Sequence, residues 1–193
     1  KKSLEIRKKI FGPDHRIVSE TLMNLGNIFN LQGRYTETEE AYNRSIEIFE
    51  KAEGPDHPDL AIYLGNFGLL YIDQGQYTKA ESTLNHSLKI FEKALGPNHP
   101  EVARVLSNLA ILNDKWGRFT KAESLIKRSM AIRGKKYGKD HPILADNFNN
   151  LSGIYFQQAR FAEAESFLRK SMAIYKKTFG LDNLDVAMTL RNL

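Results

Sequence analysis

The sequence predicts an all-α protein, a solenoid of antiparallel helix pairs. Three observations support this fold class. The 193 residues repeat with a step of 42 and without insertion or deletion, apolar residues within each repeat are three or four positions apart, and glycines follow the expected helix ends. One helix pair cannot bury its apolar face alone, so each repeat must pack against its neighbours in an array.

The clearest repeated feature is a loop motif of the form Gly-Pro-Asp-His. The motif or a close variant occupies residues 12–15, 54–57, 96–99 and 138–141, and a divergent copy follows at 180–183. A serine series has the same step, at Ser3, Ser45, Ser87, Ser129 and Ser171. We therefore expect a single array over residues 1–193. Its parts are the end of a preceding repeat (1–11), four whole repeats (12–53, 54–95, 96–137 and 138–179) and the start of a further repeat (180–193).

The first helix of each repeat is visible in the apolar spacing. In the second repeat, Leu60, Leu64, Phe67 and Tyr71 are three or four residues apart, which is the period of one helix face. Gly75 is placed to end this helix, because glycine adopts the left-handed backbone that commonly follows a helix. The spacing therefore predicts a helix that ends shortly before Gly75.

The second helix has its own start and stop signals. Residues 78–81 have the sequence Thr-Lys-Ala-Glu, which predicts a capping box at the helix start, and similar boxes occur at 36–39 and 120–123. Apolar residues continue to Leu95, and Gly96-Pro97 ends the helix. Asn98 or His99 then caps the next helix, with Pro100 in its first turn, where a missing N–H has no cost.

These residues resemble the tetratricopeptide repeat pattern, carried in the second repeat by Leu64, Phe67-Gly68, Tyr71, Gly75, Tyr77 and Ala80. A typical tetratricopeptide repeat has 34 residues. The 42-residue length, the Leu-Gly-x-x-His-Pro connection and the run Asn149-Asn150-Leu151 are similar to the repeats of kinesin light chains and nephrocystin-3-type arrays. The resemblance implies a right-handed superhelix in which the first helices line a concave groove.

Some positions depart from the pattern, among them Ala159, Ala162, Asn113 and Thr38. Ala159 stands where the other repeats have a helix-ending glycine, and Asn113 replaces the expected aromatic residue. A left-handed backbone at Ala159 would carry roughly 1 kcal/mol of strain.

Composition excludes several classes of protein. The absence of cysteine rules out disulfide frameworks, thiolate zinc sites and iron–sulfur clusters. The longest apolar stretch, residues 69–72, is too short to cross a bilayer, and residues 1–11 lack the apolar core of a signal peptide. A net charge of +5 without an aromatic and basic platform does not indicate nucleic acid. We expect a cytoplasmic protein that binds neither membrane nor nucleic acid.

The recurrent histidines and glutamates do not predict catalysis, a metal site or a cofactor. His15, His57, His99 and His141 occupy the same loop of separate repeats, so they cannot converge on one ion, and helix-start packing explains them better. We attribute Glu39, Glu81 and Glu123 to the capping boxes. No nucleophile triad, phosphate loop or metalloprotease motif is present, so we expect no enzyme here.

An asparagine series is the strongest functional signal: Asn24, Asn66, Asn108, Asn150 and Asn192. Asparagine is a mediocre residue inside a helix, because its amide competes for backbone hydrogen bonds. The resemblance to kinesin light chains implies that this column contacts a bound peptide in the concave groove. The alternative is a set of Asn–Asn or Asn–backbone hydrogen bonds that tie neighbouring repeats together. Helical neighbours of the column supply further candidates for the peptide-binding groove: Ile72, Arg104, Ile111, Lys115 and Phe156.

The sequence thus favours a protein–protein interaction scaffold that binds an extended peptide or partner segment. A second hypothesis is a structural or regulatory spacer of a larger signalling protein, acting by self-association or intramolecular docking. It rests on charge: repeat 12–53 has 4 basic and 8 acidic residues, and repeat 96–137 has 9 basic and 3 acidic residues. Charged outer faces of this kind could join two copies into a homo-oligomer.

Overall fold

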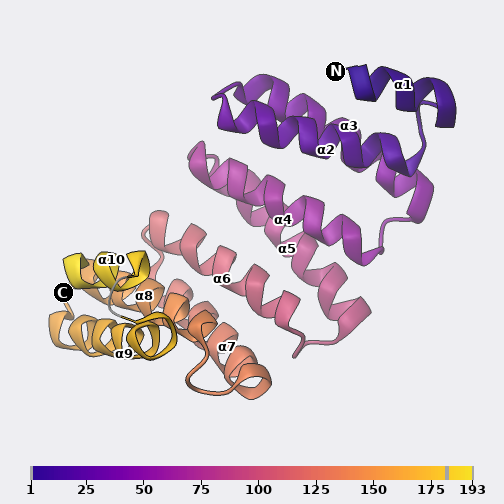
Figure 1. Cartoon of the computed structure of the whole chain (residues 1–193). Coiled ribbons are helices and arrows are strands. Elements are labelled where there is room, and N and C mark those ends of the chain that lie inside the picture. The colour runs from indigo at the N-terminus through magenta and orange to yellow at the C-terminus, as the bar shows by residue number, and fades with distance from the viewer. Residues whose placement is uncertain (1, 181–182, 193) are drawn as a thin grey trace. The chain divides into compact units, whose positions relative to one another are not determined.

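The structure is a computed structural model that describes residues 2–180 and 183–192, except for the side chains of Asp185 and Asn192. This part of the chain forms ten α-helices, in agreement with the all-α prediction (Figure 1). The helices belong to two compact units, Lys1–Pro97 and Asn98–Leu193. Unit 1 contains α1 (Lys2–Phe11), α2 (Arg16–Leu31), α3 (Tyr35–Glu53), α4 (Pro58–Asp73) and α5 (Tyr77–Leu95). Unit 2 contains α6 (Pro100–Lys115), α7 (Phe119–Tyr137), α8 (Pro142–Gln157), α9 (Phe161–Phe179) and α10 (Leu184–Asn192).

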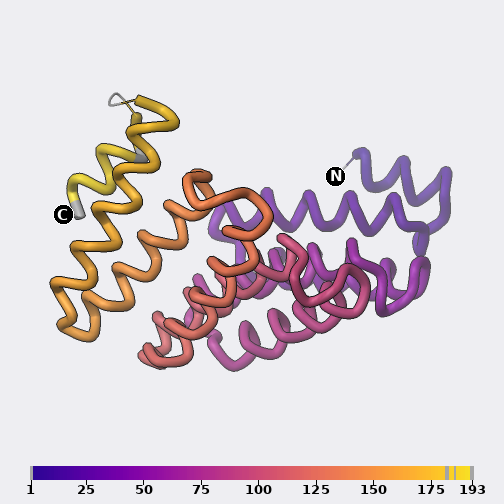
Figure 2. Tube along the Cα trace, turned by 90° about the horizontal axis from the view of Figure 1, so that it is seen from below, coloured from indigo at the N-terminus to yellow at the C-terminus, as the bar shows by residue number. Residues whose placement is uncertain are grey.

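Each repeat is a helical hairpin. In unit 1, α2 packs on α3 and α4 on α5; in unit 2, α6 packs on α7 and α8 on α9. The partners in each pair run antiparallel (Figures 1 and 2). Neighbouring hairpins within a unit also pack together, through α3 and α4 in unit 1 and through α7 and α8 in unit 2. Every repeat therefore contributes one first helix and one second helix, as the sequence predicts.

Histidine caps the first helix of every whole repeat. The Nδ1 atom of the cap residue accepts a hydrogen bond from the backbone N–H two residues later, at 3.1–3.2 Å, in His15, His57, His99 and His141. A helix start leaves backbone donors without intrahelical partners, and the imidazole satisfies one of them. The helix-start interpretation of the four histidines is confirmed.

The predicted capping boxes of the second helices are wrong. These helices begin at Tyr35, Tyr77, Phe119 and Phe161, and the preceding cap residues form no side-chain cap bond. The threonine of each box is therefore already inside the first helical turn. The turn between the helices is closed by backbone bonds instead, such as Arg34 N–H to Phe29 O at 2.9 Å and Gln76 N–H to Tyr71 O at 2.8 Å.

Two of the recurrent glutamates, Glu39 and Glu123, join neighbouring repeats. Glu39 accepts a hydrogen bond from Tyr71 Oη, and Glu123 accepts one from Tyr155 Oη, each at 2.9 Å and each from the first helix of the next repeat. Partial burial raises the pKa of Glu123, but hydrogen bonds from Lys127, Tyr155 and Arg160 together hold it below its usual range. These bonds account for Glu39 and Glu123, which are two repeats apart; the position that would contact Glu81 in this way carries Asn113 instead of tyrosine.

The serine series closes each hairpin from inside. Ser45, Ser87, Ser129 and Ser171 are all fully buried, and each Oγ donates to a backbone carbonyl of the first helix 26 residues earlier, at 2.7–3.0 Å. A small hydroxyl at this place lets the two helices approach closely while its own polar atom remains satisfied. The four bonds fix the register of the second helix on the first.

The helix-ending turn confirms the strained conformation expected at Ala159. Its φ is 58°, while the glycines at the same position of the other repeats, Gly33, Gly75 and Gly117, have φ of 69°, 70° and 76°. A side chain in this region clashes with its own backbone, which costs about 1 kcal/mol.

Ala159→Gly should therefore raise the melting temperature by about 1–3 °C, because the relief of strain exceeds the entropy that glycine adds to the unfolded chain. Thermal unfolding followed by circular dichroism measures the shift. Ala162→Gly is the control: this exposed residue lies in the first turn of α9, where glycine should lower the melting temperature. Equal shifts of the melting temperature in the two variants would show that the backbone at Ala159 is not strained.

Candidate functional site

The asparagine side chains of the column are accessible. Asn24 is exposed, and Asn66, Asn108 and Asn150 are half-buried; the side chain of Asn192 lies outside the described residues. Within the described part of the chain, none of the four carboxamides forms a hydrogen bond. Their donors and acceptors are therefore left to solvent or to a ligand.

The column belongs to an exposed stripe on each first helix, which we call the first-helix stripe. Its positions are spaced four, three and four residues apart, so they share one face of the helix. In unit 1 the stripe consists of Glu20, Asn24, Asn27 and Leu31 on α2, and of Ile62, Asn66, Leu69 and Asp73 on α4. Leu31, Ile62 and Leu69 are 88%, 40% and 36% exposed, so this part of the stripe presents apolar surface.

In unit 2 the first-helix stripe is more polar. It consists of Arg104, Asn108, Ile111 and Lys115 on α6, and of Asp146, Asn150, Gly153 and Gln157 on α8. All eight residues are exposed or half-buried. Arg104 Nε donates to Glu101 Oε2 at 2.7 Å, which holds the guanidinium beside the first turn of α6.

Two candidates from the sequence lie off this stripe. Ile72 is only 3% exposed, so its side chain belongs to the core of unit 1 and is not presented to a ligand. Ile72 is six positions beyond Asn66, and two successive steps of three residues rotate it by about 120° around the helix, from the surface to the interior. Phe156 is 62% exposed and lies edge-on to Phe161, with 5.4 Å between the ring centroids.

A cavity of about 380 Å³ lies beside Phe156 in unit 2. It is lined by Asn149, Ser152, Gly153, Phe156, Gln157, Ala164, Leu168 and Arg191. The Oδ1 atom of Asn149 is buried and has no hydrogen-bond partner in the described residues. In the sequence, Asn149 stands out only as part of a family motif, because the equivalent positions Gly65 and Ser107 carry other side chains.

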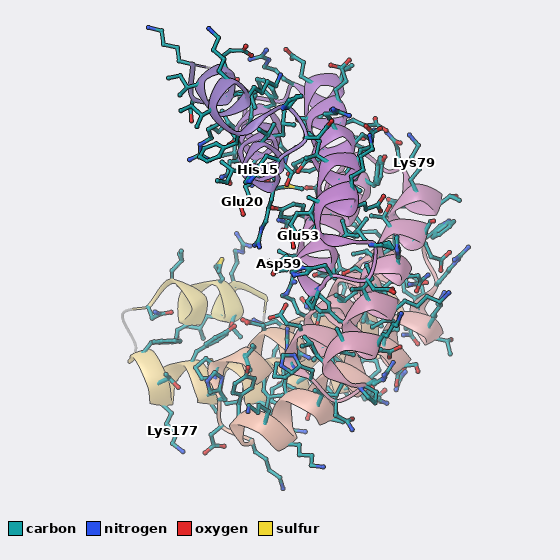
Figure 3. The ribbon with its side chains drawn as sticks, turned by 90° about the vertical axis from the view of Figure 1, so that its right-hand side faces the viewer. His15, Glu20, Glu53, Asp59, Lys79 and Lys177 are labelled. Carbon is teal, nitrogen blue, oxygen red and sulfur yellow. The ribbon has the colours of Figure 1, made fainter. Side chains whose placement is uncertain are left out.

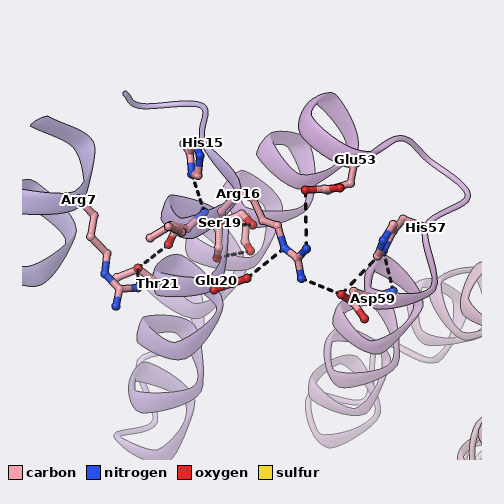
Figure 4. Close-up of polar contacts among 11 residues, drawn as sticks. Arg7, His15, Arg16, Ser19, Glu20, Thr21, Glu53, His57 and Asp59 are labelled. Carbon is pink, nitrogen blue, oxygen red and sulfur yellow. Dashed lines mark hydrogen bonds and ion pairs between the residues drawn. The ribbon is translucent and has the colours of Figure 1, made fainter. Parts of the chain in front are cut away.

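An ion-pair network at the N-terminal end of α2 lies next to the stripe in unit 1. Arg16 contacts Asp59 at 2.9 Å, Glu20 at 3.1 Å and Glu53 at 3.8 Å (Figure 4). It thus links α2 to α3 and α4. The three carboxylates lie on one side of unit 1, away from Lys79 (Figure 3). The repeat pattern does not reveal this network, because the positions equivalent to Arg16 carry proline or leucine.

Unit 2 contains a buried polar network between α7 and α8. Arg133 is 8% exposed and donates through Nη1 to Asn147 Oδ1, and Asn147 Nδ2 donates to Ser129 Oγ at 3.1 Å. Burial lowers the pKa of Arg133, against the opposing charge of Asp146. Arg133 belongs to the basic repeat 96–137, whose charges were expected on the outer face. The structure corrects this, because its side chain points into the packing between two repeats.

Two unusual residues near the end of α6 are structural. Asn113 replaces the aromatic residue of the other repeats and is buried, with Nδ2 donating to Leu109 O at 2.7 Å. Trp116 is half-buried under Arg118, whose guanidinium carbon lies 3.4 Å from the ring centroid. This stacking accounts for the only tryptophan in the chain through local packing.

Within residues 2–180 and 183–192, no three His, Asp or Glu side chains gather as metal ligands do. None of the helices in this part of the chain combines the length and apolar character needed to span a bilayer.

Comparisons with solved structures agree with the fold. BtubC (BKLC) from P. vanneervenii is 22% identical over 84% of this chain, with a TM-score of 0.76, and the match spans 65% of that protein. A putative kinesin light chain with nearly identical TPR-like repeats from Podosopora anserina is 23% identical, with a TM-score of 0.75 over 91% of this chain and 83% of that chain. Aspartyl phosphate phosphatase F from Bacillus subtilis is 16% identical, with a TM-score of 0.77 over 91% of this chain and 44% of that chain.

At these identities the likeness shows the fold alone. No curated protein matches the sequence. The sequence model of the tetratricopeptide repeat, however, matches residues 17–93, 66–135, 117–177 and 143–193, which together cover most of the chain. With the helical hairpins and the 42-residue step, these matches show that the chain belongs to the tetratricopeptide repeat family.

Proposed function

We propose that the chain binds an extended peptide, or an extended segment of a partner protein, along the first-helix stripe. Tetratricopeptide repeats form protein–protein interaction scaffolds. The observation that carries the specific proposal is that four carboxamides at one repeat position are accessible and have no hydrogen-bond partner in the described residues. An unbonded asparagine is unfavourable inside a helix, so a role in binding explains its recurrence.

A carboxamide suits recognition of a peptide backbone. It offers one acceptor and two donors, so it can bond both the C=O and the N–H of a peptide group. An extended peptide presents these groups at regular intervals whatever its side chains are. A column of equivalent asparagines can therefore hold different peptides by their backbones, as strand-adding domains do with their own backbone groups.

Other side chains on the stripe, and Phe156 beside it, supply side-chain selectivity. In unit 1, Ile62 and Leu69 favour apolar side chains of the ligand. In unit 2, Arg104 and Lys115 favour acidic side chains, Ile111 adds apolar area, and Phe156 provides an exposed aromatic anchor beside the 380 Å³ cavity. Aromatic and arginine side chains are the usual energetic centres of such interfaces. The proposal assigns no catalytic role to these residues, and the repeat fold is typically a non-catalytic scaffold.

The test is to select peptides from a random display library and to measure their affinity for the Asn66→Ala/Asn108→Ala variant. Loss of two net hydrogen bonds should weaken binding about 10- to 30-fold. Helicity should remain unchanged, since alanine is the better helix former. Isothermal titration calorimetry measures the affinity, and circular dichroism measures the fold.

Asn43→Ala/Asn85→Ala is the matched control. It removes two exposed carboxamides from the second helices, at one shared repeat position, and should leave binding unchanged. Equal binding by both double variants, or a library that yields no binder, would contradict the proposal and favour the self-associating spacer.

A further inference from the structure

Three of the four whole repeats contain an ion pair between the aspartate of the loop before the first helix and a cation of the second helix. Asp14 pairs with Arg44 at 2.7 Å, Asp56 with Lys93 at 2.5 Å and Asp140 with Lys177 at 2.5 Å. Lys93 and Lys177 stand at equivalent positions of their repeats. The loop aspartate is therefore the usual partner of the second-helix cation.

The third repeat breaks this pattern. Asn98 stands where the other loops have aspartate, and Lys135 stands at the position of Lys93 and Lys177. Lys135 is exposed, and within the described residues its ammonium has no hydrogen bond or ion pair. A neutral amide has replaced the carboxylate, while the cation that the carboxylate would neutralise is retained.

A cavity of about 450 Å³ lies at this place. It is lined by Asn98, Arg128, Ala131, Ile132, Lys135 and Lys136. Lys136 is a cation that the other repeats lack, because Ala52, Ala94 and Thr178 stand at its position. Arg128 stands at the position of Arg44, His86 and Lys170, which is basic in three of the four repeats. Ile132 is 5% exposed and forms an apolar floor with Ala131. The cavity thus combines three cations, an amide donor and an apolar base.

We propose that this cavity binds an anionic side chain, carboxylate or phosphate, from an acidic segment of a partner polypeptide. The site is additional to the first-helix stripe, since its lining comes from α7 and the loop before α6. An anion there would receive charge-assisted hydrogen bonds from Lys135 and Lys136 and a hydrogen bond from the Asn98 amide. The apolar floor accepts the methylene groups of a glutamate or phosphoserine. The lining contains no aromatic ring, so it lacks the stacking surface of a single-stranded nucleic acid site.

The experiment measures fluorescence anisotropy with two labelled peptides, one rich in glutamate and one in which phosphoserines replace the glutamates. We expect at least one to bind, and the better binder identifies the anion. Asn98→Asp supplies the carboxylate found in the other repeats and should weaken binding about fivefold, as should Lys135→Ala. Asn98→Asp should also keep or raise the melting temperature, so weaker binding by this variant cannot result from unfolding.

Asn85→Asp and Lys177→Ala are the matched controls, because they change the net charge equally at sites away from the cavity. Each should weaken binding less than about twofold. The proposal is overturned if neither peptide binds, or if each control weakens binding as much as the cavity variant that it matches. It is also overturned if a single-stranded oligonucleotide binds more tightly than both peptides and loses as much affinity as they do on Asn98→Asp.

Discussion

Gly26→Ala is expected to destabilise the protein by about 2 kcal/mol, although alanine is the better helix former. A Cβ atom at Gly26 would lie 2.5 Å from Cδ1 and Cε1 of Tyr42. The ring cannot easily move away, because it is 2% exposed, donates its hydroxyl to Asn27 and lies edge-on to Phe67 at 5.3 Å. Overpacking of this kind lowers the free energy of unfolding by about 1–3 kcal/mol or more. The higher helix propensity of alanine offsets about 1 kcal/mol of this loss. Urea-induced unfolding measures the difference.

The structure offers a control and a rescue. Gly153 is also helical, but a Cβ atom there meets nothing within 4 Å, so Gly153→Ala should stabilise the protein by up to about 1 kcal/mol. The third repeat carries Ala110 and Ile126 at the positions of Gly26 and Tyr42, and both are buried in one cluster. Gly26→Ala/Tyr42→Ile should therefore be more stable than the sum of its single changes predicts. If the single substitution Gly26→Ala stabilises the protein, the approach between a Cβ atom at position 26 and the Tyr42 ring is not tight.

The fold was predictable because it depends on features that recur in every repeat. The 42-residue step, the apolar spacing and the glycines were enough to place every first and second helix, and the histidine caps also followed. The capping boxes failed for a local reason. Thr36 and Glu39 have the right spacing, but the backbone turn after Gly33 starts the helix at Tyr35 and leaves the threonine inside it. The glutamate instead serves a contact with the next repeat, which a short motif cannot reveal.

The candidate site was predictable only in part, for the same reason. The period located the asparagine column and the stripe around it, but it could not distinguish Leu69 on the surface from Ile72 in the core. It also could not find features that occur once. The Arg16 network, the Arg133 network and the cavity beside Asn98 all lie where one repeat departs from the others. In each place the departure involves a partner that is distant in sequence, so it becomes interpretable only in three dimensions.

Asn147→Ala is expected to cost about 3 kcal/mol of stability, because it leaves a buried charge without its hydrogen-bond acceptor. Arg133 donates to Asn147 Oδ1, and its Nε atom already has no acceptor in the described residues. In this part of the chain, no carboxylate forms an ion pair with the guanidinium. Removing the partner of a buried charge is costly, whereas removing an exposed amide costs little. Asn85→Ala, at an exposed position of α5, is the control and should change stability by less than about 0.5 kcal/mol.

An aromatic pair should replace this network without loss of stability. At the same two positions, the interface between α3 and α4 contains Phe49 and Tyr63, whose ring centroids are 5.0 Å apart at an interplanar angle of 69°. Buried polar groups can often be exchanged for apolar ones at no cost when every partner is replaced together. Arg133→Phe/Asn147→Tyr should therefore unfold at a urea concentration equal to or above that of the unmodified protein. If the double variant is instead as unstable as Asn147→Ala, the buried arginine contributes packing that an aromatic pair cannot supply, and the two interfaces are not interchangeable.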